Sequence, residues 1–111
     1  MNTLKSLFLS ATTKTALGVL GQLIKGARLE RSMSQVELAE RIGVSRHTVM
    51  AIEKADPKVA IGAVLEAATI LGVPLLADDT QGLNKLAGTV ANLATLLPAR
   101  SKRKVVLNDD F

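Results

Sequence analysis

The chain has 111 residues, of which 48% are hydrophobic and 22% are charged, and its formal net charge is +4. This length allows one modest hydrophobic core, and the composition is that of a globular chain. The absence of cysteine excludes disulfides and thiolate metal sites, and the one histidine, His47, cannot form a zinc site alone. The positive charge permits a polyanionic partner without requiring one.

The only aromatic residues, Phe8 and Phe111, stand near the two ends of the sequence, so the core must be aliphatic. The apolar residues lack the strict alternation of β-strands, which favours an all-α fold. The apolar run Leu7–Leu9 is too short for a secretion signal, and no stretch approaches the ~20 apolar residues of a membrane span. We therefore expect a cytoplasmic protein with no membrane partner.

The first part of the chain predicts an arm followed by a helix. Residues 1–13 are interpreted as an N-terminal arm, either packed loosely on the domain or exchanged between two copies. From about Thr15 to Arg31, apolar residues recur at helical spacing: Leu17, Leu20, Ile24 and Ala27. Gly18, Gly21 and Gly26 weaken this helix by up to ~1 kcal/mol each relative to alanine. We attribute these three glycines to close packing against a neighbouring element.

The stretch from Ser34 to Glu53 predicts two short helices joined by a tight turn. Ser34 and Glu37 have the spacing of a capping box, in which two amide groups at the helix start are satisfied reciprocally. Gly43 ends the first helix, since glycine tolerates the left-handed conformation needed there. The apolar face of that helix is predicted from Val36, Leu38, Ala39 and Ile42.

The second helix of this stretch begins after Ser45, a good N-cap residue. Its apolar side is narrow, with Val49 and Ile52 three residues apart. The residues predicted to lie outside are Arg46, His47, Met50 and Ala51. A helix that presents arginine and histidine from its first turn suits insertion into the major groove of DNA.

Two further helices are predicted beyond a loop that contains Pro57. The apolar stripe of the first is Ile61, Val64, Leu65, Ala68 and Leu71, and Gly72 ends it. The short segment Leu75–Ala77 fits either a small strand at a dimer interface or an extended connector. Asp78, Asp79 or Thr80 then caps a helix to Leu97, whose apolar seam has coiled-coil spacing: Leu83, Leu86, Val90, Leu93 and Leu97.

Residues 99–111 change from basic to acidic and are interpreted as a flexible tail. The basic cluster consists of Arg100, Lys102, Arg103 and Lys104. Two interpretations remain open for this cluster, namely a solvated end and an arm that contacts the DNA backbone.

Roughly from residue 17 to residue 75, the chain resembles the helix-turn-helix domain of the Cro/phage-repressor (XRE) family. The positions that carry this resemblance are Gln35–Ala39, Gly43–Arg46, Thr48, Val49, Ile52 and Glu53. The resemblance implies an all-α, five-helix lambda-repressor-like fold with an extra C-terminal helix and a flexible tail. The expected organisation is an arm at 1–13, a DNA-binding domain at 14–79, a dimerisation or packing helix at 80–98 and the tail at 99–111.

The same resemblance assigns roles to individual residues of the predicted site. Gln35 would touch phosphate and brace the side chain that contacts the bases, and Arg46 and His47 occupy the base-contacting positions. Arg46 can bind guanine O6 and N7 bidentately, which discriminates bases by about 1–3 kcal/mol. Ser45 and Thr48 match positions that anchor phosphates. Arg28 and Glu53 match a buried structural ion pair.

Three members of the predicted set depart from the family pattern or have an alternative role. Ala51 stands where relatives carry a longer polar side chain and offers only a methyl contact. Met50 is a candidate for contact with DNA, and the alternative is that its side chain only fills space at the edge of the hairpin. His47 has the alternative of a solvated surface residue.

The expected partners are operator DNA and a second copy of the chain, because one such module contacts too few bases for useful specificity. Beyond Gly72 the chain resembles, more weakly, HipB-type antitoxins, whose partner is a HipA-like serine/threonine kinase toxin. This suggests an antitoxin and autorepressor of a type II toxin–antitoxin operon. The alternatives are a stand-alone phage or host XRE-family regulator, and an adaptor that has lost DNA binding. No nucleophile–base set, cofactor motif or metal motif is present, so no enzymatic activity is expected.

Overall fold

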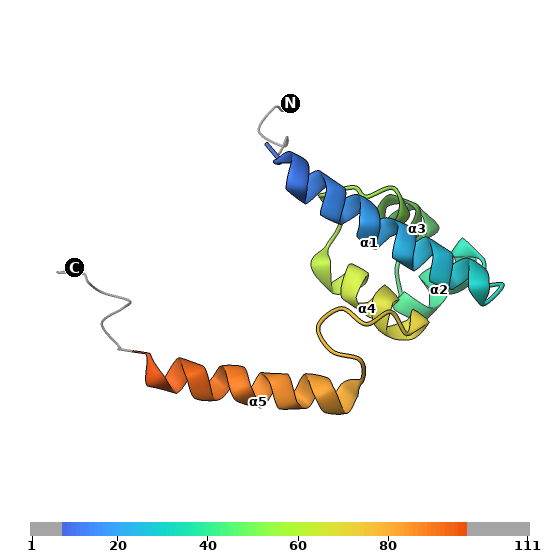
Figure 1. The fold of residues 1–111 in the computed structure, drawn as a ribbon. Helices are drawn as coiled ribbons and strands as arrows, with labels where there is room; N and C mark the ends of the chain where they lie inside the picture. Colours follow the sequence, from blue (N-terminus) through green and yellow to red (C-terminus); the bar gives the residue numbers. More distant parts are fainter. Residues whose placement is uncertain (1–7, 98–111) are drawn as a thin grey trace. The chain divides into compact units, whose positions relative to one another are not determined.

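Residues 8–97 are described by a computed structural model, and this part of the chain contains five helices and no strand. It divides after Pro74 into two compact units. The first unit holds four helices, α1 (Ala11–Glu30), α2 (Gln35–Ile42), α3 (Arg46–Glu53) and α4 (Ile61–Leu71), and the second holds α5 (Thr80–Leu96) (Figure 1). The prediction of an all-α chain with an additional C-terminal helix is confirmed.

Helix α1 begins at Ala11, earlier than the start predicted near Thr15, so residues 11–13 belong to the helix and not to an arm. Ser10 supplies the reason, because its hydroxyl accepts a hydrogen bond from the amide of Thr13 at 3.2 Å. This N-cap satisfies one of the amides that the first turn leaves without a partner. Residues 1–7, which hold most of the predicted arm, lie outside the described residues.

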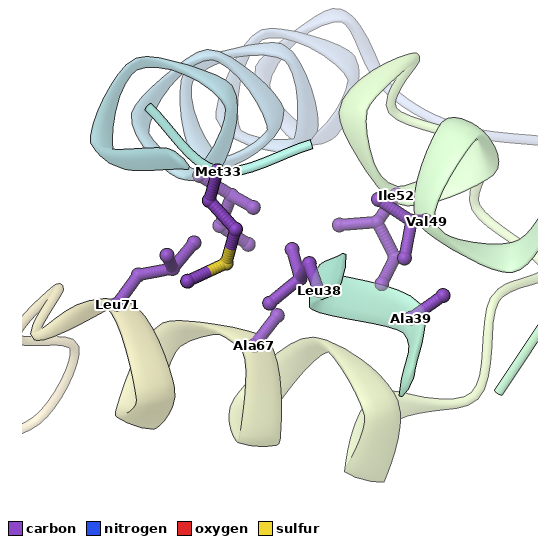
Figure 2. Close-up of a cluster of buried hydrophobic side chains, with 8 residues drawn as sticks. Met33, Leu38, Ala39, Val49, Ile52, Ala67 and Leu71 are labelled. Carbon is purple, nitrogen blue, oxygen red and sulfur yellow. The ribbon is translucent and has the colours of Figure 1, made fainter. Parts of the chain in front are cut away.

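The core of the first unit is aliphatic, as the sequence predicts, and all four helices contribute to it. Figure 2 shows the side chains of α2, α3 and α4 converging, with Met33 entering from the segment between α1 and α2. The buried apolar residues are Ile24, Met33, Leu38, Ala39, Val49, Ile52, Ala67, Ala68 and Leu71. Their burial removes apolar surface from water, which is the main favourable contribution to folding.

Three predicted core positions are wrong, one on α2 and two on α4. Val36 is half exposed, because it stands on the solvent side of the first turn of α2. On α4, Ile61 and Leu65 are exposed and Ala67 is fully buried instead. Ala67 and Leu71 both belong to the core cluster of the unit, so the buried side of α4 carries one small and one large side chain.

The three glycines of α1 have different surroundings, and only Gly21 has a packing role. A Cβ atom at Gly21 would lie 2.8 Å from the carbonyl oxygen of Glu53 and 2.9 Å from that of Ile52. Gly21 therefore lets α1 rest directly on the last turn of α3. No atom lies within 4 Å of a Cβ built at Gly18 or Gly26, so the prediction of close packing there is wrong.

The segment after α4 is a connector made of bends, so it is neither the predicted strand nor an extended stretch. Gly72 ends α4 in the left-handed region with φ of 72°, and Leu75–Asp79 follow as bends. Asp79 then caps α5, accepting a hydrogen bond from the amide of Gly82 at 2.7 Å. No residue of α5 is buried.

We predict that Gly21→Ala lowers the free energy of unfolding by about 1–3 kcal/mol, because the new methyl group would overlap backbone atoms that cannot move cheaply. The matched control is Gly26→Ala on the same helix, which should raise stability by up to ~1 kcal/mol through helix propensity. Urea denaturation of both variants measures this difference. Equal effects would show that α1 and α3 do not pack as closely as described.

Candidate nucleic-acid interface

The local sequence builds the turn between α2 and α3 as predicted. Ser34 and Glu37 form the complete capping box, with the Ser34 hydroxyl accepting from the Glu37 amide and the Glu37 carboxylate accepting from the Ser34 amide, each at 3.0 Å. Gly43 has φ of 84°, a left-handed conformation that a residue with Cβ would adopt only with strain. Ser45 then caps α3 through a 3.2 Å hydrogen bond from the amide of Thr48. These three features set the angle between the helices.

The first turn of α3 presents its polar side chains to solvent. Ser45, Arg46 and His47 are exposed, and Thr48 is half-buried with its hydroxyl oxygen 3.2 Å from that of Ser45. Met50 and Ala51 are half-buried, so they lie less far outside than predicted. The accessible edge of α3 is therefore its N-terminal turn, where the helix dipole also favours a negatively charged ligand.

Gln35, the first residue of α2, lies between the exposed edge of α3 and the interior of the unit. Its Oε1 atom accepts a hydrogen bond from Nε of Arg46 at 3.3 Å. Its Nε2 atom donates to Oε1 of Glu53 at 3.1 Å. The predicted support of Arg46 by Gln35 is thus present in the structure of the protein alone.

Arg28 and Glu53 form the predicted buried ion pair. Nε and Nη2 of Arg28 donate to the two carboxylate oxygens of Glu53 at 2.6 and 3.0 Å, and the side chains are 8% and 4% exposed. The remaining nitrogen, Nη1, donates to the carbonyl oxygen of Met33 at 2.8 Å. The paired geometry compensates the cost of removing both charges from water, which an isolated buried charge could not do.

Two contacts of this network were not predicted from the sequence, namely Arg28 to Met33 and Gln35 to Glu53. Both join residues whose side-chain directions depend on how the helices pack, and a residue pattern carries no signal for them. The predicted basic cluster of the tail, Arg100 to Lys104, lies outside the described residues.

The described part of the chain holds no group of three or more histidine or acidic side chains that could bind a metal ion. Among residues 8–97, no helix combines the length and the apolar character that crossing a membrane requires.

Two capped helices at a glycine turn, on a core of four helices, define a helix-turn-helix protein. The family model described as a helix-turn-helix domain matches residues 19–79, more than half of the chain, and the chain belongs to this family. It is also 36% identical over 72 residues to a protein of Methanosarcina acetivorans provisionally named HTH-type transcriptional regulatory protein. That match covers 65% of this chain and 22% of the relative, so the chain spans about a fifth of the relative's length. No solved structure matches the chain.

We predict that Glu53→Ala lowers the free energy of unfolding by about 3–5 kcal/mol, since it leaves the buried guanidinium of Arg28 without a counter-charge. Glu40→Ala on the exposed side of α2 is the control and should change stability by less than about 0.5 kcal/mol. Thermal and urea unfolding followed by circular dichroism measure both. A small effect at Glu53 would mean that the pair contributes little to the fold.

Proposed function

We propose that the protein is a sequence-specific DNA-binding transcriptional repressor that acts as a homodimer. The observation that supports this most strongly is the reading edge, by which we mean the exposed residues Ser45, Arg46 and His47 at the start of α3. In a helix-turn-helix protein this turn enters the major groove, where side chains reach the edges of the bases.

Each residue of the proposed site has a distinct part in this model. Arg46 donates to guanine, and His47 contacts a base or a phosphate. We assign phosphate contacts to the hydroxyl groups of Ser45 and Thr48 and to the side chain of Gln35, because all three residues stand at the starts of helices. Met50 and Ala51 offer apolar contacts only, so most of the discrimination between bases comes from the first turn of α3.

Arg46→Ala should abolish specific binding while leaving the fold intact, because Arg46 is exposed and its only described partner is Gln35. The matched control is Lys25→Ala, which removes the same charge from an exposed position on α1 and should weaken binding only slightly. Gel-shift titration against a duplex selected by the wild-type protein measures both. Unchanged affinity of the Arg46 variant would exclude this residue from base recognition.

Helix α5 supports the proposal of a homodimer. Its seam residues remain accessible, with Val90 54% and Leu93 57% exposed, and Lys85 is the one charged residue between Thr80 and Leu96. An exposed apolar seam of this length is suited to contact with another protein surface. Pairing of two copies through this seam would join two helix-turn-helix units, as binding to a two-fold symmetric operator requires.

We predict that Leu86→Asp combined with Leu93→Asp yields monomers, because both charges would have to enter the apolar seam. The control is Asn84→Asp combined with Asn92→Asp, which adds the same two charges to the polar side of α5 and should leave the dimer intact. Sedimentation or light scattering distinguishes the two variants. A dimer that persists in the leucine variant would assign dimerisation to another surface.

The antitoxin role is the more specific form of this proposal. It is supported by the accessible apolar seam of α5 and by the charged C-terminal sequence, both of which could contact a second protein. The alternative is a stand-alone regulator, and the relative from Methanosarcina acetivorans is named as an HTH-type transcriptional regulatory protein. A reading frame for a HipA-like kinase directly beside this gene, and co-purification of its product with the chain, would support the antitoxin. A gene neighbourhood without such a frame would support the stand-alone regulator.

A further inference from the structure

One continuous chain of hydrogen bonds runs from the interior of the first unit to its surface. It begins at the carbonyl oxygen of Met33, which accepts from Arg28, and continues through both oxygens of Glu53. Gln35 donates to Glu53 and accepts from Arg46, which is exposed. Every link is between 2.6 and 3.3 Å. The buried ion pair and the reading edge are therefore connected through a single amide group.

The carboxylate of Glu53 determines the orientation of the Gln35 side-chain amide. An ionised carboxylate accepts hydrogen bonds and cannot donate them, so the Gln35 group that faces Glu53 must be Nε2. The opposite orientation would place two oxygen atoms against each other at about 3 Å. Because Nε2 faces inward, Oε1 of Gln35 must face Arg46.

This orientation has a consequence for Arg46. Its Nε is engaged by Gln35, so the pair of terminal nitrogens, Nη1 and Nη2, is left for an outside acceptor. Two parallel donors at that end match O6 and N7 of a guanine. An arginine held in this way loses less conformational freedom when it binds than a free one does.

We propose that Glu53 is a positioning residue for base recognition, which it controls without touching DNA. It sets the orientation of the Gln35 amide, and the amide sets the orientation of the Arg46 guanidinium. This inference rests on the proposed function and adds to the structural role of the ion pair. If it holds, discrimination between bases depends on the buried carboxylate of Glu53, which two successive hydrogen bonds connect to Arg46.

The test uses a duplex that the wild-type protein enriches from a randomised pool. The quantity measured is the discrimination ratio, defined as the Kd for a duplex with one G·C pair replaced by A·T divided by the Kd for the selected duplex. The relevant pair is the one that wild type discriminates and Arg46→Ala does not. The ratio cancels any uniform loss of affinity, including one caused by partial unfolding.

Gln35→Leu interrupts the chain of hydrogen bonds and leaves the Arg28–Glu53 pair intact. Glu53→Gln removes the carboxylate that orients the amide. We expect each to lower the discrimination ratio by about tenfold, the size of effect that loss of one charge-assisted hydrogen bond produces. In the Arg46→Ala background, Gln35→Leu should have no further effect on the ratio.

Gln35→Glu is a second interruption of the chain of hydrogen bonds. It sets a carboxylate against Glu53 in place of the amide that donates to it, so this variant should not retain the ratio either.

Ile24→Val, a change in the fully buried core, is the control for a purely structural role. It should weaken binding to all duplexes equally and leave the ratio unchanged. If Glu53→Gln and Gln35→Leu behave like this control, Glu53 has no positioning role and the proposal is overturned. If the wild-type protein enriches no duplex at all, the proposed function fails as well, so the two failures are distinguishable.

Discussion

The fold of the helix-turn-helix unit depends on the ion pair between Arg28 and Glu53. This pair joins the C-terminal end of α1 to the last turn of α3, and a third hydrogen bond ties Met33 and the start of α2 to the same guanidinium. Two charges so deeply buried cost a great deal of hydration, and only good geometry compensates for that cost. Gly21 makes the geometry possible, since any larger residue would hold the two helices apart.

Much of this arrangement could be predicted from the sequence. The capping box at Ser34, the glycine that ends α2 and the serine that caps α3 are local signals, which depend on neighbours within four residues. Capping residues and helix-ending glycines of this kind can be recognised in a single sequence. The Arg28–Glu53 pair spans 25 positions, and it was predicted only through the resemblance to a family.

The wrong predictions about helix packing share a physical cause. The glycines of α1 look alike in sequence, but only Gly21 faces another backbone, because packing angles decide which face of a helix is crowded. On α4, helical periodicity favoured large residues for the core, whereas close packing selected Ala67. The start of α1 was missed because apolar periodicity is weak in its first turns, where a hydroxyl cap is the stronger signal.

The first unit explains where nucleic acid would bind, and α5 offers a separate apolar surface for association. The proposed contact between the first turn of α3 and DNA is tested most directly by amide chemical-shift mapping. Titration of labelled protein with a selected duplex should shift the amide signals of Gln35 and residues 45–48 most strongly. If the largest shifts instead fall on α4, or if no signal near α3 moves, the proposed interface is wrong.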